Sequence, residues 1–256
     1  MKLAPITVRS QAIETSPFQR QPLLKLPALP HKHQSQGSNP VVLISDFDKT
    51  LTPHSSQGYG LSEEMKYLSI QEFFDIINQR WVEGEGYIEC YMKELLERAN
   101  RKDLHHVLSP KSLRSMGETV EMIRGVDSFV PKLQKYSQQL GIQTKFGILS
   151  SGLEEMINGT KVAKHAEENI RGNRFEYDSD GHVVGFERLI EPKDKPTQLN
   201  EMLNGETLLA YLGDGATDID AWEEAKNHGA KRIAVFGDDT HQKQVEGFLN
   251  KGLVDS

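Results

Sequence analysis

The chain has 256 residues, 37% of them apolar, which is enough to bury a core as one α/β domain with an insert or as two small domains. Its net charge of −7 gives no electrostatic reason to expect binding to nucleic acid or to an anionic membrane, and no apolar run approaches the ~18 residues that a membrane span needs. The single cysteine, Cys90, excludes an internal disulfide and a thiolate-rich metal site.

Residues 1–40 differ in composition from the rest of the chain. They contain six of the eleven prolines and five Lys or Arg residues, but only one acid, Glu14. This composition, which has no sustained apolar period, predicts a disordered or extended arm. The arm lacks the continuous apolar core of a secretory signal. Its low acid content leaves an organelle transit sequence as an alternative, but we expect a cytoplasmic protein.

The first strand is predicted over Val41–Ser45, and Asp46 and Asp48 follow it directly. In an open parallel α/β sheet, ligands bind at the carboxyl ends of the strands. Two acids at this spacing point to opposite faces of a strand, so both can face one ligand only if the chain turns away here, as the stretch 50–53 suggests. Such a pair can supply a nucleophile and a general acid and base beside a divalent cation. A polar loop after a strand is the alternative interpretation.

About a hundred residues separate these acids from the next predicted strand, which is too many for one crossover. Apolar residues recur at helical spacing in 62–81 and in 87–99. A serine and a proline at 109–110 predict the cap and the first-turn proline of a third helix. We therefore expect a helical insert, with a return to the main domain at Gly125.

The second strand is predicted to end in Ser150, Ser151 and Gly152, with a helix beginning at Leu153. Either serine could cap that helix and also offer a hydroxyl and backbone N–H groups to an anion. An ordinary N-cap without a ligand is the alternative.

Two lysines precede the next helix, which is predicted over 198–203. Lys195 lies just before the start of this helix, where a lysine could reach a phosphate, and Lys193 is an alternative for the same role. A pair of ordinary surface lysines is the simpler interpretation.

A further predicted strand, 208–212, ends in a glycine-flanked acid, Asp214, and a second acid, Asp218, follows four residues later. The flanking glycines let the backbone turn tightly and place Asp214 at the strand tip. Asp218 falls in the first turn of the next helix, where negative charge is tolerated. A strand over 232–236 and a helix near 241–249 complete an alternation that requires a parallel sheet with helices on both faces, a doubly wound α/β fold.

Taken together, these residues resemble the four motifs of the haloacid dehalogenase-like hydrolase superfamily, over about Val41 to Phe236. The strings DFDKTLT (46–52) and GDGATD (213–218) are the most specific of these motifs. The stretch 175–185, two short predicted strands around an Asp-Gly turn, is similar to a hairpin of the phosphoserine phosphatase-like branch. True phosphoserine phosphatases carry a substrate-reading glutamate nine residues after the first aspartate, where this chain has Ser55, so the resemblance does not imply phosphoserine as the substrate.

The resemblance implies a Mg²⁺-dependent phosphatase that acts through an aspartyl-phosphate, with Asp46 as the nucleophile and Asp48 as the general acid and base. The implied metal ligands are Asp46, Asp48 (through its backbone carbonyl), Asp214 and Asp218. Of these, Asp218 would ligate through water or orient the lysine. The implied phosphate-binding residues are Thr50, Ser150, Ser151, Gly152 and Lys195.

The resemblance also implies a Rossmann-like core domain, formed by 41–54 and 125–256, and a helical cap domain, 55–124, inserted between the first two motifs. The cap would select a small phosphorylated metabolite, with Arg80 as the first candidate for contacting an anion. No nucleic-acid or membrane partner is expected, and a homodimer is compatible with the sequence. A phosphomutase, which shares the aspartyl-phosphate chemistry, and a non-catalytic binding or regulatory protein on this fold are the alternatives.

Overall fold

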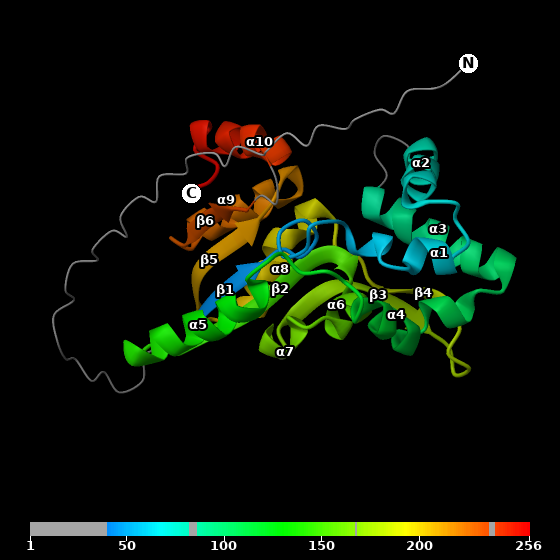
Figure 1. The fold of residues 1–256 in the computed structure, drawn as a ribbon, viewed down its shortest axis with the longest axis horizontal. Helices are drawn as coiled ribbons and strands as arrows, with labels where there is room; N and C mark the ends of the chain where they lie inside the picture. The colour runs from blue at the N-terminus through cyan, green and yellow to red at the C-terminus, as the bar shows by residue number, and fades with distance from the viewer. Residues whose placement is uncertain (1–39, 82–85, 167, 236–238) are drawn as a thin grey trace, which may run out of the picture. The chain divides into compact units, whose positions relative to one another are not determined.

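The computed structural model describes residues 40–81, 86–166, 168–235 and 239–256 (Figure 1). The N-terminal arm predicted over 1–40 lies outside these residues, apart from Pro40. Within the described ranges, no helix combines the length and the apolar character needed to cross a membrane.

A six-stranded sheet has the strand order β4-β3-β2-β1-β5-β6. Its strands are β1 (Val41–Ser45), β2 (Thr144–Leu153), β3 (Ile170–Tyr177), β4 (Val183–Arg188), β5 (Thr207–Gly213) and β6 (Lys231–Ala234). All neighbouring strands are parallel except β3 and β4, which form the antiparallel hairpin predicted over 175–185. Because β1 lies between β2 and β5, the strand order reverses at β1, and ligands bind beside the carboxyl end of such a strand.

Helices cover both faces of the sheet because both faces of β1 are apolar. Ile44 shares an apolar cluster with Leu199 and Trp222, whereas Leu43 points to the other face and clusters with Val130. The helices of the α/β part are α5 (Val126–Gln139), α6 (Glu154–Gly159), α7 (Ala163–Ala166), α8 (Lys195–Leu203), α9 (Ile219–Asn227) and α10 (Asp239–Asn250). The predicted doubly wound α/β fold is confirmed.

Five α-helices separate β1 from β2 in the chain, and the first four of them lie beside β3 and β4 (Figure 1). This helical insert consists of α1 (Leu61–Glu64), α2 (Ile70–Arg80), α3 (Tyr87–Lys102) and α4 (Pro110–Gly117), with 3₁₀ turns at Ser56–Gly58 and His105–Leu108. Ser109 caps α4 and Pro110 occupies its first turn, as predicted. The apolar core of the insert includes Phe175 and Val183 of the hairpin, so the predicted domain limits around 55–124 stay a prediction.

The helical pattern predicted over 62–81 is interrupted in the structure. Lys66 has a left-handed backbone with φ of 60°, and α2 begins after it, capped by Ser69, whose hydroxyl accepts a backbone N–H. Leu68, which fits the apolar stripe by its spacing, is 92% exposed. The serine cap therefore starts a new helix where the apolar period alone predicts a continuous one.

The carboxyl end of the insert packs directly on the α/β part. A Cβ built on Gly117 would lie 2.0 Å from the carbonyl oxygen of Met156, and one built on Gly159 would lie 2.0 Å from that of Arg114, so α4 and α6 meet backbone to backbone. Arg114 also pairs with Glu155 at 2.8 Å. One end of the insert is therefore fixed to the helix that follows the second motif.

Candidate active site

The first two acids lie where the chain leaves β1. Asp46 still extends the sheet, since its N–H donates to the carbonyl of Leu212 in β5 at 2.8 Å. The chain then turns, because the N–H of Leu51 donates to the carbonyl of Phe47 at 2.9 Å, and the buried Phe47 side chain packs in the core. Asp46 is thus presented at the strand tip, while Asp48 lies in the turn.

Lys195, the first residue of α8, is the centre of the candidate site. Its side chain is 1% exposed, and its Nζ donates to Asp46 Oδ1 at 2.9 Å and to Asp218 Oδ1 at 2.7 Å. Burial alone would lower the pKa of Lys195, but the carboxylates of Asp218 and Asp46 raise it well above its ordinary value. Lys193 is exposed on the preceding 3₁₀ turn (Pro192–Asp194). Of the two lysines, the geometry favours Lys195.

Both carboxylate oxygens of Asp218 are occupied by hydrogen bonds. Besides Lys195, its Oδ1 accepts from the hydroxyl of Tyr211 at 2.9 Å. Its Oδ2 accepts from the backbone N–H groups of Asp214 at 3.1 Å and Gly215 at 3.4 Å. With four donors around it, Asp218 is better placed to orient Lys195 and the Asp214 loop than to bind a metal ion directly.

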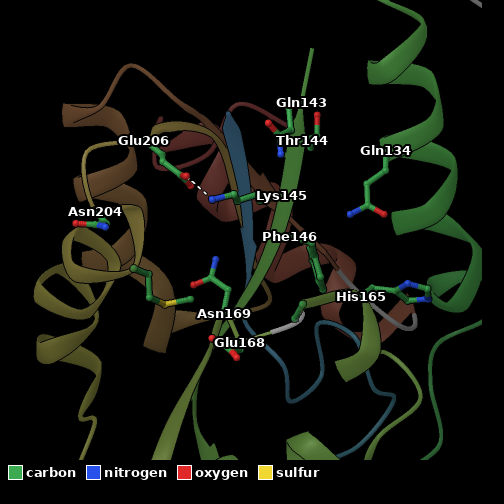
Figure 2. Close-up of a pocket in the computed structure, with 12 residues that line it drawn as sticks. Gln134, Gln143, Thr144, Lys145, Phe146, His165, Glu168, Asn169, Asn204 and Glu206 are labelled. Carbon is green, nitrogen blue, oxygen red and sulfur yellow. Dashed lines mark hydrogen bonds and ion pairs between the residues drawn. The ribbon is translucent and has the colours of Figure 1, made fainter. Parts of the chain in front are cut away.

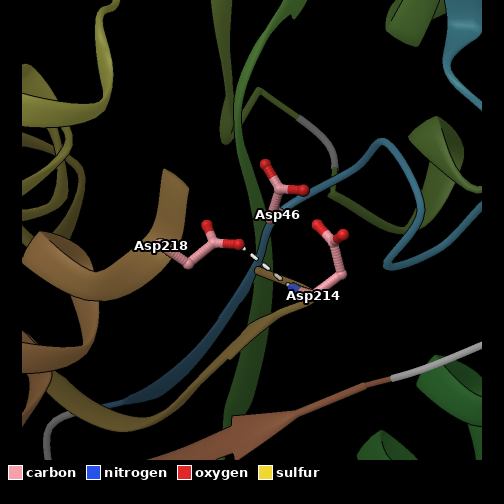
Figure 3. Close-up of side chains that lie close together, drawn as sticks. All are labelled: Asp46, Asp214 and Asp218. Carbon is pink, nitrogen blue, oxygen red and sulfur yellow. Dashed lines mark hydrogen bonds between the residues drawn. The ribbon is translucent and has the colours of Figure 1, made fainter. Parts of the chain in front are cut away.

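Carboxylates at the tips of β1 and β5 could hold a metal ion. Asp46, Asp214 and Asp218 each offer a carboxylate oxygen, and the three oxygens lie within 4.8 Å of one another (Figure 3). Burial and the charge of Asp218 raise the pKa of Asp214 to about 6. No donor among the described residues contacts the Asp214 carboxylate, and an unpaired carboxylate beside Asp46 fits a cation that prefers oxygen ligands, such as Mg²⁺. Asp46 and Asp214 are therefore the candidate ligands.

Asp48 is held by a residue that was not among those predicted. The N–H of Ser56 donates to Asp48 Oδ1 at 2.6 Å, and the hydroxyl of Ser56 donates to Oδ2 at 3.2 Å. Burial raises the pKa of Asp48, and the two bonds from Ser56 offset part of this effect. A carboxyl group with a raised pKa is suited to giving and taking a proton. No spacing in the sequence distinguishes Ser56 from its neighbour Ser55.

Three of the predicted phosphate-binding residues lie next to the two acids of the first motif. The hydroxyl of Thr50 donates to Asp46 Oδ2 at 3.3 Å. Ser150 is buried, and its hydroxyl accepts the N–H of Gly152 at 3.0 Å. A Cβ built on Gly152 would lie 3.1 Å from Asp48 Oδ2. Thr50 therefore reaches Asp46, and Gly152, with Ser150, lies beside Asp48.

The prediction that Ser150 or Ser151 caps the following helix is wrong. Strand β2 continues to Leu153, and α6 begins at Glu154 without a side-chain cap. Both serines keep an extended backbone because β2 still pairs with β3 at Leu153. The hydroxyl of Ser151 is buried and has no hydrogen-bond partner within the described part of the chain.

Arg80, the predicted anion contact of the cap, is engaged inside the insert. Its guanidinium pairs with the buried Glu94 and, at 2.9 Å, with Glu97. Two carboxylates already balance its charge, so the structure does not support the predicted role.

A cavity of about 350 Å³ lies away from these residues, at the amino end of β2 (Figure 2). Lys145 pairs with Glu206 there, and His165 and Asn169 contribute to the lining. None of the predicted site residues lines this cavity. Because ligands of doubly wound sheets bind at the carboxyl ends of the strands, it is not the candidate active site.

The chain matches no protein-family model and no curated protein sequence. Its structure is similar to a phosphoserine phosphohydrolase-like protein from Francisella tularensis subsp. tularensis SCHU S4, at 18% identity over 80% of this chain and 92% of that chain, with a TM-score of 0.53. It is also similar to a phosphoserine phosphatase solved as a phospho-aspartyl intermediate analogue, at 17% identity over 84% of this chain and 99% of that chain, with a TM-score of 0.54. A HAD family hydrolase from Salmonella enterica subsp. enterica serovar Typhi matches at 17% identity over 79% of this chain and 70% of that chain, with a TM-score of 0.50. The chain therefore has the haloacid dehalogenase-like fold of the phosphoserine phosphatases.

Replacing Lys195 should unbalance the buried charges. Lys195→Met leaves the carboxylates of Asp46 and Asp218 without their cation, which should lower the free energy of unfolding by about 3 kcal/mol at about pH 8. Burial raises the pKa of Asp46 and the charge of Lys195 lowers it, so loss of Lys195 should raise this pKa further. The folded variant should then bind more protons than folded wild type as the pH falls, and the loss in free energy of unfolding should shrink toward about pH 5. Urea denaturation in EDTA measures both effects.

The matched control is Lys193→Met, which removes the exposed lysine of the same segment and should change the free energy of unfolding by less than about 0.5 kcal/mol. Equal effects of the two substitutions, or a deficit that grows as the pH falls, would contradict the assigned charge balance.

Proposed function

We propose that this chain, with a haloacid dehalogenase-like fold, is a Mg²⁺-dependent phosphatase that hydrolyses a small phosphomonoester through an aspartyl-phosphate on Asp46. The observation that carries the proposal is the buried contact of Lys195 with Asp46 and Asp218, with the unpaired carboxylate of Asp214 beside it. This arrangement offers one nucleophile, one fixed cation and a place for a second cation at the carboxyl end of the central strand.

Asp46 is oriented for nucleophilic attack, because Lys195 holds one of its oxygens and Thr50 the other. Attack on phosphorus forms the aspartyl-phosphate bond while the bond between phosphorus and the leaving oxygen breaks. Water then attacks phosphorus, inorganic phosphate leaves and the Asp46 carboxylate is regenerated. The difficult hydrolysis is thereby divided into two easier steps.

Asp48 serves both steps as the proton carrier. In the first step it gives its proton to the leaving oxygen, so that the alcohol departs neutral. In the second step the ionised Asp48 takes a proton from the attacking water. Its raised pKa supports the first role, and the two donors on Ser56 hold it in one orientation for both.

The carboxylates of Asp46 and Asp214 and the backbone carbonyl of Asp48 would hold Mg²⁺, which when bound offsets the repulsion between Asp46 and the phosphoryl oxygens. Lys195 contributes to the same balance, because its charge faces Asp46 from within the core. Asp218 acts through Lys195 and through the Asp214 loop.

The proposed substrate is a small phosphorylated metabolite. The carboxyl end of β1 is followed directly by the helical insert, whose Ser56 contacts Asp48. Two of the similar structures carry phosphoserine phosphatase or phosphohydrolase in their descriptions. This chain has Ser55 where the resemblance calls for a substrate-reading glutamate, so phosphoserine itself is not proposed.

Asp46→Asn should lower turnover by about 10³-fold or more, because the amide replaces the proposed nucleophile. Release of inorganic phosphate from a panel of phosphomonoesters with Mg²⁺ measures the loss, and a thermal melt checks the fold. Asp220→Asn, an exposed position on α9, is the control that should keep turnover. Near wild-type activity of Asp46→Asn would refute the covalent role, and transfer of phosphate within a sugar would favour a phosphomutase.

Asp214→Ala should raise the Mg²⁺ concentration needed for half-maximal activity by at least about 10-fold, because it removes a proposed ligand. Excess EDTA should abolish wild-type activity, and added Mg²⁺ should restore it. Asp220→Ala serves as the control for loss of a nearby exposed acid. Full wild-type activity in EDTA would overturn the metal assignment.

Ser56→Ala should affect substrates according to their leaving group. It removes a donor to Asp48, so kcat/KM, which reports the first step, should fall by about 10-fold for an alkyl phosphate, whose leaving oxygen needs a proton. For para-nitrophenyl phosphate, whose leaving group departs without a proton, kcat/KM should change by less than about twofold. Ser55→Ala is the matched control for both substrates, and equal losses of kcat/KM on the two substrates would show that Ser56 does not act through Asp48 in the first step.

A further inference from the structure

The amino end of helix α3 rests on a carboxylate from the loop that carries Lys195. Glu191 Oε1 accepts the backbone N–H of Glu89, in the first turn of α3, at 2.9 Å. Burial raises the pKa of Glu191, while the N–H groups of Glu89 and Ile88 lower it. The contact joins residues 102 positions apart in the sequence, so it ties the helical insert to the α/β part.

Among the described residues, helix α3 has no side-chain cap from its own N-cap position. Its N-cap position is Gly86, which has no side chain to accept a hydrogen bond, although the first N–H groups of a helix need acceptors. A Cβ built on Gly86 would lie 2.3 Å from Glu191 Oε1, so the absence of a side chain leaves room for the carboxylate. Glu191 therefore replaces a local cap with one from a distant segment.

Glu191 also begins the short turn that places Lys195. Its N–H donates to Asp194 Oδ2 at 3.0 Å, and the N–H of Asp194 donates back to the Glu191 carbonyl at 2.9 Å. Pro192 and Pro196 lie on either side of Asp194 and Lys195, and each proline fixes its own φ. A displacement of Glu191 is therefore passed to Lys195 within four residues.

We propose that Glu191 is a positioning residue that couples the placement of α3 to the placement of Lys195. When α3 rests on Glu191, the turn is held and Lys195 faces Asp46; when the insert moves away, the turn loses this contact. Because α4 meets α6 backbone to backbone, a movement of the insert would have to take place at its other helices. The catalytic role of Lys195 rests on the proposed function, whereas the coupling between α3 and the turn that carries Lys195 does not.

Glu191→Ala in the full chain tests the coupling. Amide hydrogen exchange should speed up by about 10-fold at Glu89 and also at Asp194 and Lys195, whose N–H groups lie in the turn. In phosphate-release assays with Mg²⁺, kcat should fall at least about fivefold, and Glu191→Gln, which keeps an acceptor oxygen, should recover part of the loss. Glu201→Ala, an exposed glutamate on α8, is the matched control that should change neither measurement.

Gly86→Ala provides a second test, because the added methyl displaces the Glu191 carboxylate without removing it. It should reproduce the exchange changes of Glu191→Ala, and the double variant should show no further increase, as expected for two substitutions that remove one interaction.

The exchange measurement does not depend on catalysis, so it separates this inference from the proposed function. Faster exchange at both Glu89 and the Lys195 turn supports the coupling even if wild type releases no phosphate, an outcome that would refute the phosphatase alone. Faster exchange at Glu89 without any change at Asp194 and Lys195 overturns the coupling, as does an additive effect in the double variant.

Discussion

The pairing of one buried lysine with two buried carboxylates is the interaction on which the candidate site depends. Lys195 joins the tip of β1, through Asp46, to the junction of β5 and α9, through Asp218. Burying three charges is costly unless each is paired and hydrogen-bonded, and the hydroxyl of Tyr211 and two backbone N–H groups complete the set around Asp218. The same contacts fix the Asp214 loop, so the geometry of the proposed metal ligands follows from this charge balance.

Two aspartates of one motif are prepared for different roles by what surrounds them. Asp46 faces a cation and a hydroxyl, which orient it and stabilise its charge. Asp48 faces a hydroxyl and a backbone N–H of Ser56, both neutral donors, and burial raises its pKa. Burial raises the pKa of both carboxyls, but only Asp46 is hydrogen-bonded to a cation, Lys195, which favours its ionised form and suits a nucleophile. Asp48, which has neutral donors, suits a proton carrier. The different roles of Asp46 and Asp48 thus follow from the turn that the chain makes immediately after β1.

Those parts of the fold that depend on local pattern could be predicted from the sequence. The strand Val41–Ser45, the hairpin and the alternation of strands and helices were predicted from apolar period and turn residues and are observed. The contacts of Ser56 and Tyr211 were not predicted, because a loop serine and a strand tyrosine carry no signal of the partner that the tertiary fold brings to them. The prediction that Ser150 or Ser151 caps a helix is wrong because of a tertiary contact as well, since pairing with β3 keeps that segment extended. The sequence favours Lys195 by its place before the helix but leaves Lys193 as an alternative, and only the burial of Lys195 and its contacts with Asp46 and Asp218 separate the two.

A phosphoryl mimic bound to the protein would test the central claim most directly. A crystal structure with Mg²⁺ and beryllium fluoride should show beryllium bonded to a carboxylate oxygen of Asp46, with Lys195 Nζ within hydrogen-bonding distance of a fluoride. The metal ion should contact Asp46 and Asp214. A complex in which the fluoride avoids Asp46, or binds in the cavity at the amino end of β2, would contradict the assignment of this site.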